Sequence, residues 1–161
     1  MDNNARLHYY NFVTRALVSE IFLKVGLCSV SFSQNSSEVL VNKTNGQTIL
    51  VDIDSESVIK TYDGYRDEER EKVVIRSTFG GANENFVVSG TRGEHTCILG
   101  DSVPEVANVL EDGTVYIWHK ENSQLIETLK GHAKGCCNAV SWNPRDPGMF
   151  ASAGDDGNIR M

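Results

Sequence analysis

Four residues in the second half of the chain have side chains suited to acid–base chemistry. They are three carboxylates in predicted turns and one histidine in a predicted loop: Asp112, Asp155, Asp156 and His132. Such groups transfer protons when they lie within hydrogen-bond reach of a substrate. The sequence contains no nucleophile elbow, no phosphate-binding Gly-x-x-x-x-Gly-Lys loop and no His-Glu-x-x-His motif. We therefore expect these residues to hold turns together, and we expect no catalytic residue.

The cysteines do not follow a metal-binding or disulfide pattern. None of the four forms a Cys-x-x-Cys motif: Cys28, Cys97, Cys136 and Cys137. The two adjacent cysteines would point to opposite faces of any strand, which suits neither a zinc site nor a disulfide framework. We expect reduced thiols, no metal or cofactor, and a cytoplasmic or nuclear location.

Charge and hydropathy exclude two classes of partner. The chain has 161 residues and a formal net charge of −7, and phosphate binding requires clustered Lys and Arg. The apolar stretch 12–23 is interrupted by Arg15 and Glu20, so it is neither a signal peptide nor a membrane span. We expect protein partners, with no nucleic acid and no membrane.

Short β-strands are the elements expected to position these residues. Alternating or apolar runs are separated by turn residues, as is typical of an all-β protein. The clearest unit covers 72–129, and its predicted strands are 73–79, 85–89, 114–118 and 124–129. The hairpin turn Asp112-Gly113 opens the third of these strands. The charged segment 63–71 before this unit is interpreted as a solvated connector.

The same order of strands occurs upstream and begins again downstream. An upstream unit covers 25–62, with a turn at Asn45-Gly46, and a partial unit covers 130–161. Two strands within 1–24 are interpreted as the end of a preceding unit. A period of roughly 40 residues with four strands per unit is typical of β-propeller blades, which bury their faces only against neighbouring blades.

Several segments resemble a known family. Residues 111–118, followed by Gly131-His132, resemble the WD-repeat consensus with its Gly-His pair and its terminal strand tryptophan. The strings at 74–81 and 139–144 are similar to a narrower family, that of WD repeat-containing protein twenty-six. This resemblance implies a WD-repeat subunit of a CTLH, or GID, ubiquitin ligase. Such a subunit assists complex assembly or recruits substrates for proteasomal degradation.

The resemblance also implies a structural role for a set of polar and aromatic residues. In WD repeats a Gly-His histidine, a strand Ser or Thr, a turn Asp and a strand Trp form a hydrogen-bonded chain within one blade. The matching residues are Ser89, Asp112, Trp118, His132, Ser152 and Asp156. Tyr65 takes the place of the histidine in the second blade, and in the last blade the tryptophan would follow Met161.

Three features depart from the family pattern. Residues 91–110 separate two strands that the family joins by a tight turn, and this insertion is either a binding loop or a retained intron. A capping box at 102–105 predicts one helical turn within it. The family's N-terminal LisH and CTLH helical region is not in this sequence. The units are expected to be too few for a closed ring of about 4 to 8 blades, so unpaired strand edges would favour self-association.

The sequence thus predicts an all-β fold. It is a partial WD-repeat β-propeller of four-stranded antiparallel blades, truncated at both ends and interrupted by an insertion. The function predicted from the resemblance is that of a non-catalytic protein-interaction scaffold in a CTLH or GID ligase. The alternatives are a generic WD-repeat signalling or trafficking adaptor and a non-functional truncated splice product, and an enzyme ranks behind both.

Overall fold

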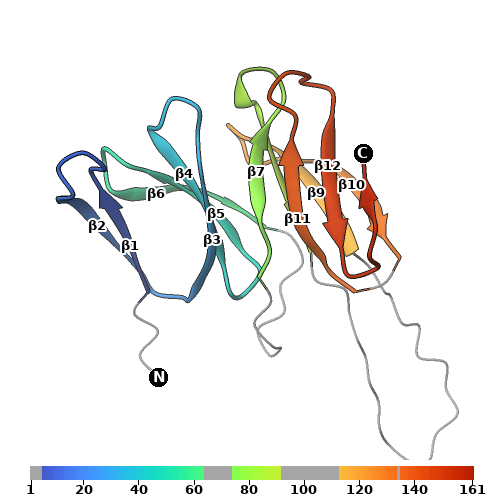
Figure 1. The fold of residues 1–161 in the computed structure, drawn as a ribbon, viewed down its shortest axis with the longest axis horizontal. Helices are drawn as coiled ribbons and strands as arrows, with labels where there is room; N and C mark the ends of the chain where they lie inside the picture. The colour runs from blue at the N-terminus through green and yellow to red at the C-terminus, as the bar shows by residue number, and fades with distance from the viewer. Residues whose placement is uncertain (1–4, 64–73, 92–112, 134) are drawn as a thin grey trace, which may run out of the picture.

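A computed structural model describes residues 5–63, 74–91, 113–133 and 135–161 (Figure 1). Its strands form four antiparallel sheets, and within each sheet the neighbouring strands are consecutive in the chain. Within the described residues the only helical element is a short 3-10 turn, Ala82–Glu84. No helix in these segments is long and apolar enough to cross a membrane. The predicted all-β fold with antiparallel four-stranded sheets is confirmed.

The four sheets follow one another along the chain. The first sheet is a hairpin of β1 (Ala5–Tyr10) and β2 (Leu17–Leu23). The second sheet contains β3 (Leu27–Phe32), β4 (Glu38–Lys43), β5 (Thr48–Asp52) and β6 (Ser57–Tyr62). The third sheet contains β7 (Ser77–Gly80), β8 (Phe86–Gly90), β9 (Gly113–His119) and β10 (Leu125–His132). The fourth sheet contains β11 (Cys137–Trp142), β12 (Phe150–Gly154) and β13 (Ile159–Arg160).

The sheets stack face to face in chain order, and the sequence of β4 shows why. Its residues Val39, Leu40 and Val41 are all at most 1% exposed. Successive side chains of a strand point to opposite faces, so an uninterrupted apolar run requires a cover on both sides. Val39 and Val41 pack against the first sheet, whereas Leu40 packs against the third sheet.

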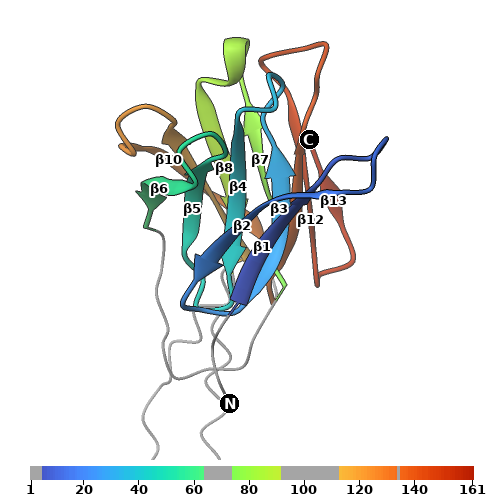
Figure 2. The same ribbon diagram turned by 90° about the vertical axis from the view of Figure 1, so that its left-hand side faces the viewer.

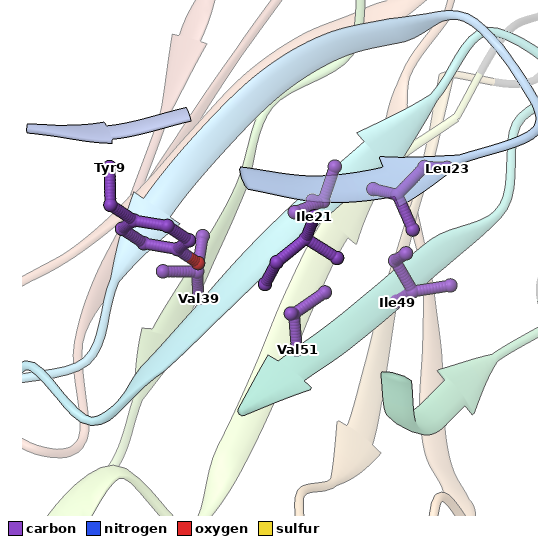
Figure 3. Close-up of a cluster of buried hydrophobic side chains, with 7 residues drawn as sticks. Tyr9, Ile21, Leu23, Val39, Ile49 and Val51 are labelled. Atoms are coloured by element: carbon purple, nitrogen blue, oxygen red, sulfur yellow. The ribbon is translucent and has the colours of Figure 1, made fainter. Parts of the chain in front are cut away.

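The interface between the first and second sheets is centred on a hydrophobic cluster (Figure 3). Its buried residues are Tyr9, Ile21 and Leu23 from the first sheet and Val39, Val41, Ile49 and Val51 from the second sheet. Complete burial of one such aliphatic side chain contributes roughly 1.5 to 3 kcal/mol. This cluster therefore gives the two-stranded hairpin a stable position that two strands alone would not have.

Two more clusters join the remaining sheets. The one between the second and third sheets contains Leu40, Leu50, Tyr62, Phe79, Val87 and Trp118. The one between the third and fourth sheets contains Val88, Val115, Cys137 and Val140. The adjacent β8 residues Val87 and Val88 thus pack in different interfaces, because successive side chains of a strand point to opposite faces of the sheet.

The third and fourth sheets approach closely because a glycine lies between them. A Cβ atom added to Gly90 would lie only 2.0 Å from the backbone oxygen of Cys137. The neighbouring Thr91 carbonyl accepts a hydrogen bond of 2.8 Å from the Cys137 N–H. A side chain at position 90 would separate these backbones.

The observed strands differ from the predicted ones at several ends. The strand predicted over 73–79 is observed only over Ser77–Gly80. The reason is that the Arg76 N–H donates to the Asn138 carbonyl of the fourth sheet at 3.0 Å, before the pairing with β8 begins at Ser77. The last strand of the third sheet continues beyond the predicted end at Leu129 and finishes at His132.

The connections β3–β4, β7–β8 and β11–β12 lie at one end of the stack (Figure 2). Corresponding loops of successive sheets therefore lie at the same end of the stack (Figure 2), and Gln34 of the β3–β4 connection contacts Glu84 of the β7–β8 connection there. Loops of this kind, placed by a rigid scaffold, are the usual contact points for partners.

Candidate functional site

The best-defined polar cluster is centred on His132, at the end of β10. Its side chain is fully buried, and its two ring nitrogens have different partners. Nδ1 lies 2.8 Å from Asp156 Oδ1, and Nε2 lies 3.0 Å from Ser152 Oγ. Ser152 is on β12 and Asp156 is in the turn before β13, so the imidazole joins the third sheet to the fourth sheet.

Asp156 accepts further hydrogen bonds. The Asn158 N–H donates to Oδ1 at 3.1 Å, and Arg160 Nη2 donates to Oδ2 at 3.0 Å. The hydrogen bond with His132, followed by those from Arg160 and Asn158, holds the pKa of Asp156 well below its ordinary value. The carboxylate is therefore ionised at neutral pH and ties the turn to both the histidine and the last strand.

The neighbouring Asp155 has a separate role. Its Oδ2 accepts a hydrogen bond of 3.0 Å from the Cys136 N–H, and its Oδ1 accepts one of 2.5 Å from Asn138 Nδ2. The two carboxylates of one turn thus bind both ends of the connection between β10 and β11. Asp156 binds His132 at the end of β10, and Asp155 binds residues at the start of β11. Of the four residues considered for acid–base chemistry, the structure brings these two and His132 together, and Asp112 lies outside the described residues.

The order Ser152–His132–Asp156 is that of a serine–histidine–aspartate triad, in which the serine attacks a bound substrate. Ser152 is only 5% exposed and lies within a strand that is paired on both sides, opposite Val140 and Arg160. The Ser152 hydroxyl is therefore shielded from solvent and engaged with His132 Nε2. The geometry is suited to locking strands together.

The other predicted site residues, Ser89 and Trp118, both face the second sheet. Ser89 is 3% exposed, and its Oγ lies 3.4 Å from Asn42 Nδ2. The Trp118 ring is 2% exposed and lies 5.6 Å from the ring of Tyr116 and 6.0 Å from the ring of Tyr62. Their expected partners Tyr65 and Asp112 lie outside the described residues.

Sequence reasoning missed Asn42, which is 3% exposed and bonded to several serines. Its position gave no local signal, because the strand predicted over 38–41 ends one residue before it, whereas the observed β4 continues to Lys43. A polar residue that continues a buried strand requires a partner from the neighbouring sheet.

Comparison with known proteins assigns the family. Residues 123–161 match the WD domain, G-beta repeat family, and this segment contains β10 to β13 with the complete His132 cluster. The chain is a WD-repeat protein. The resemblance read from residues 74–81, 111–118 and 139–144 is confirmed by this match and by the relatives described next.

The WD-repeat chain is similar to three relatives over most of its length. It is 34% identical over 152 residues to GID complex subunit 7 of Schizosaccharomyces pombe, which covers 94% of this chain and 25% of that protein. It is 36% identical over 136 residues to the WD repeat-containing protein 26 homolog of Arabidopsis thaliana, covering 84% of this chain and 19% of that protein. It is 34% identical over 162 residues to the WD repeat-containing protein 26 homolog of Drosophila melanogaster, covering 99% of this chain and 22% of that protein. The chain thus spans a quarter or less of the length of these relatives.

Acid is expected to weaken this WD-repeat structure through Asp156. Its folded pKa is depressed, so the unfolded chain takes up the proton first as the pH falls below about 4. The contribution of this carboxylate is complete above that pH and declines as the pH approaches the folded value. Thermal unfolding of wild type and Asp156→Asn, followed by circular dichroism from pH 7 to pH 2.5, measures this. The wild-type advantage in Tm should be largest near neutrality and shrink in acid, and an advantage that is constant across this range would contradict it.

The thiols provide a second expected result. None of the described cysteines, Cys28, Cys136 and Cys137, takes part in a disulfide. Burial raises the pKa of Cys137 to about 11, and the thiolate is the reactive form. Iodoacetamide at pH 7.5, followed by peptide mass spectrometry, should leave Cys137 unmodified in the folded chain and alkylate it rapidly in urea. Rapid alkylation without denaturant would contradict the packing between the third and fourth sheets.

Metal binding finds no support in the described parts of the WD-repeat chain. No group of three or more His, Cys, Asp or Glu side chains there is arranged to hold a metal ion. Its ionisable groups near His132 are instead paired with one another and with backbone N–H groups.

Proposed function

We propose that this chain contributes WD-repeat blades to a subunit of a CTLH or GID-type ubiquitin ligase and serves there as a non-catalytic protein-binding scaffold. The observation that carries the proposal is the similarity to GID complex subunit 7 and to two WD repeat-containing protein 26 homologs over 84% to 99% of the chain. A ligase scaffold of this kind binds other subunits, substrates or regulators, and leaves ubiquitin transfer to other subunits.

The arrangement of polar groups supports a scaffold. His132 is engaged with Ser152 and Asp156 inside the stack, and the exposed Asp155 is engaged with Cys136 and Asn138. The side chains best suited to chemistry therefore stabilise blades. The loops at the ends of the strands stay available for partners, and the net charge of −7 favours proteins over nucleic acid. The proposal includes a cytoplasmic or nuclear location.

Affinity purification tests this proposal. The tagged 161-residue chain would be expressed in cells that contain a GID-type ligase and captured, and co-purifying proteins would be quantified by mass spectrometry. Two variants serve as controls: Trp118→Ala, which disrupts the interface between the second and third sheets, and Val58→Ala, which changes a side chain that is 44% exposed.

The proposal predicts that ligase subunits are enriched with wild type and with Val58→Ala and are lost with Trp118→Ala. A folded wild-type chain that recovers no ligase subunit would contradict the ligase assignment. Equal recovery by the disrupted variant would contradict the idea that the stacked blades form the binding platform.

A further inference from the structure

Asn42 has a complete set of hydrogen-bond partners inside the protein. Its Oδ1 accepts hydrogen bonds from Ser29 Oγ at 2.9 Å, from the Ser77 N–H at 3.2 Å and from the Ser77 hydroxyl. Its Nδ2 donates to Thr48 Oγ1 at 3.0 Å and lies 3.4 Å from Ser89 Oγ. A buried amide with these partners is stable in place, whereas the loss of the amide would remove a hydrogen-bond partner from Ser77 and Thr48, both of which are buried.

These partners belong to two different sheets. Ser29 and Thr48 lie on β3 and β5 of the second sheet, and Ser77 and Ser89 lie on β7 and β8 of the third sheet. Ser29 Oγ also lies 2.9 Å from the Ile75 carbonyl oxygen, just before β7, so its single proton is shared between the amide and this carbonyl. Asn42 is therefore the centre of a polar connection between two stacked sheets.

The corresponding position in the next sheet is a glycine. Asn42 pairs with Thr48, two residues after the turn glycine Gly46, and Gly90 pairs with Val115, two residues after Gly113. At Gly90 the third and fourth sheets meet with no room for a Cβ. At Asn42 an amide side chain spans the space between the second and third sheets. The same register position is therefore an asparagine in the interface of the second and third sheets and a glycine in that of the third and fourth sheets.

The same two sheets are also tied at the far end of their strands. The Glu84 carboxylate in the β7–β8 connection accepts hydrogen bonds from the Gln34 N–H in the β3–β4 connection, with N···O distances of 2.9 and 3.0 Å. Nearby, Lys120 forms an ion pair with Glu38, and both side chains are largely buried. Glu84 has a φ of 56°, a conformation that costs a non-glycine residue energy and persists where surrounding contacts enforce it.

We infer that Asn42 is a positioning residue that sets the spacing between the second and third sheets and thereby holds the Gln34–Glu84 contact at the loop end of the stack. Two sheets joined at both ends of their strands are fixed in tilt as well as in distance. Removal of the spacer at one end therefore changes the gap at the other end. This inference does not rest on the proposed function.

The N–H proton resonance of Gln34 in NMR spectra of the full chain tests this inference, because it reports on a contact remote from Asn42. The variant Glu84→Ala gives the resonance of Gln34 without the carboxylate. Asn42→Ala should move the Gln34 resonance toward that value. Ser77→Ala, which removes only one partner of Asn42, should move it in the same direction by less, and it serves as the test if Asn42→Ala does not fold.

The matched control is Val41→Ala. Val41 is the adjacent residue of β4, is fully buried, and packs on the opposite face against the first sheet. The variant Val41→Ala should lower Tm and leave the Gln34 N–H resonance unchanged. The inference is overturned if Asn42→Ala lowers Tm without moving this resonance, if Val41→Ala moves it equally, or if Ser77→Ala is the only folded variant and leaves it unchanged.

Discussion

Replacement of Trp118 by alanine is expected to lower the free energy of unfolding by about 3 to 5 kcal/mol, as is usual when a large buried aromatic residue is truncated. The indole is 2% exposed and belongs to the cluster that joins the second and third sheets. Its ring lies 6.0 Å from that of Tyr62. The variant loses packing on both sides of the interface, because the β-strand ladders around it cannot collapse into the cavity.

Urea unfolding followed by circular dichroism measures this loss. Val58→Ala is the control, because its side chain is 44% exposed and on the outer strand β6. Substitutions at such positions usually change stability by about 0.5 kcal/mol or less. A loss of unfolding free energy below about 1 kcal/mol for Trp118→Ala would be far less than the truncation of a buried aromatic side chain costs. Such a result would contradict the stacked arrangement.

The second large effect is expected for His132→Ala. This change removes the partner of the buried Ser152 hydroxyl, and an unsatisfied buried group of this kind costs about 1 to 3 kcal/mol. It also separates the Asp156 turn from β10, since the imidazole is their connection. The fourth sheet should therefore lose protection from hydrogen exchange more than the second sheet does.

A double-mutant cycle identifies the cause. Because Ser152 and His132 act as a pair, Ser152→Ala should be less destabilising in the His132→Ala background than in wild type. Hydrogen exchange and urea unfolding of the four proteins provide the comparison. Strictly additive losses would mean that the hydroxyl and the imidazole stabilise the fold independently.

Much of the fold could be predicted from the sequence because its signals are local. The apolar run in β4 and the turn Asn45-Gly46 identify a buried strand and a hairpin without knowledge of the neighbours. A recurring family pattern predicts His132, Ser152 and Asp156 at fixed positions in a repeat, and the structure has the imidazole within hydrogen-bond distance of both side chains.

The remaining features depend on contacts between sheets, which one sequence does not display. The late start of β7 follows from the hydrogen bond of Arg76 to Asn138 in another sheet. Likewise, nothing local distinguishes Asn42 from a surface asparagine at a strand end, because its partners Ser77 and Ser89 come from the next repeat. The contact of Glu84 with Gln34 joins loops that are 50 residues apart.

The most direct test of a WD-repeat scaffold in a GID-type ligase is binding between purified components. The 161-residue chain would be immobilised and exposed to a purified ligase assembly that lacks its own WD-repeat subunit, with binding followed by biolayer interferometry. We expect saturable binding by wild type that is abolished by Trp118→Ala and retained by Val58→Ala. A folded chain that does not bind the assembly at any attainable concentration would contradict the proposed role.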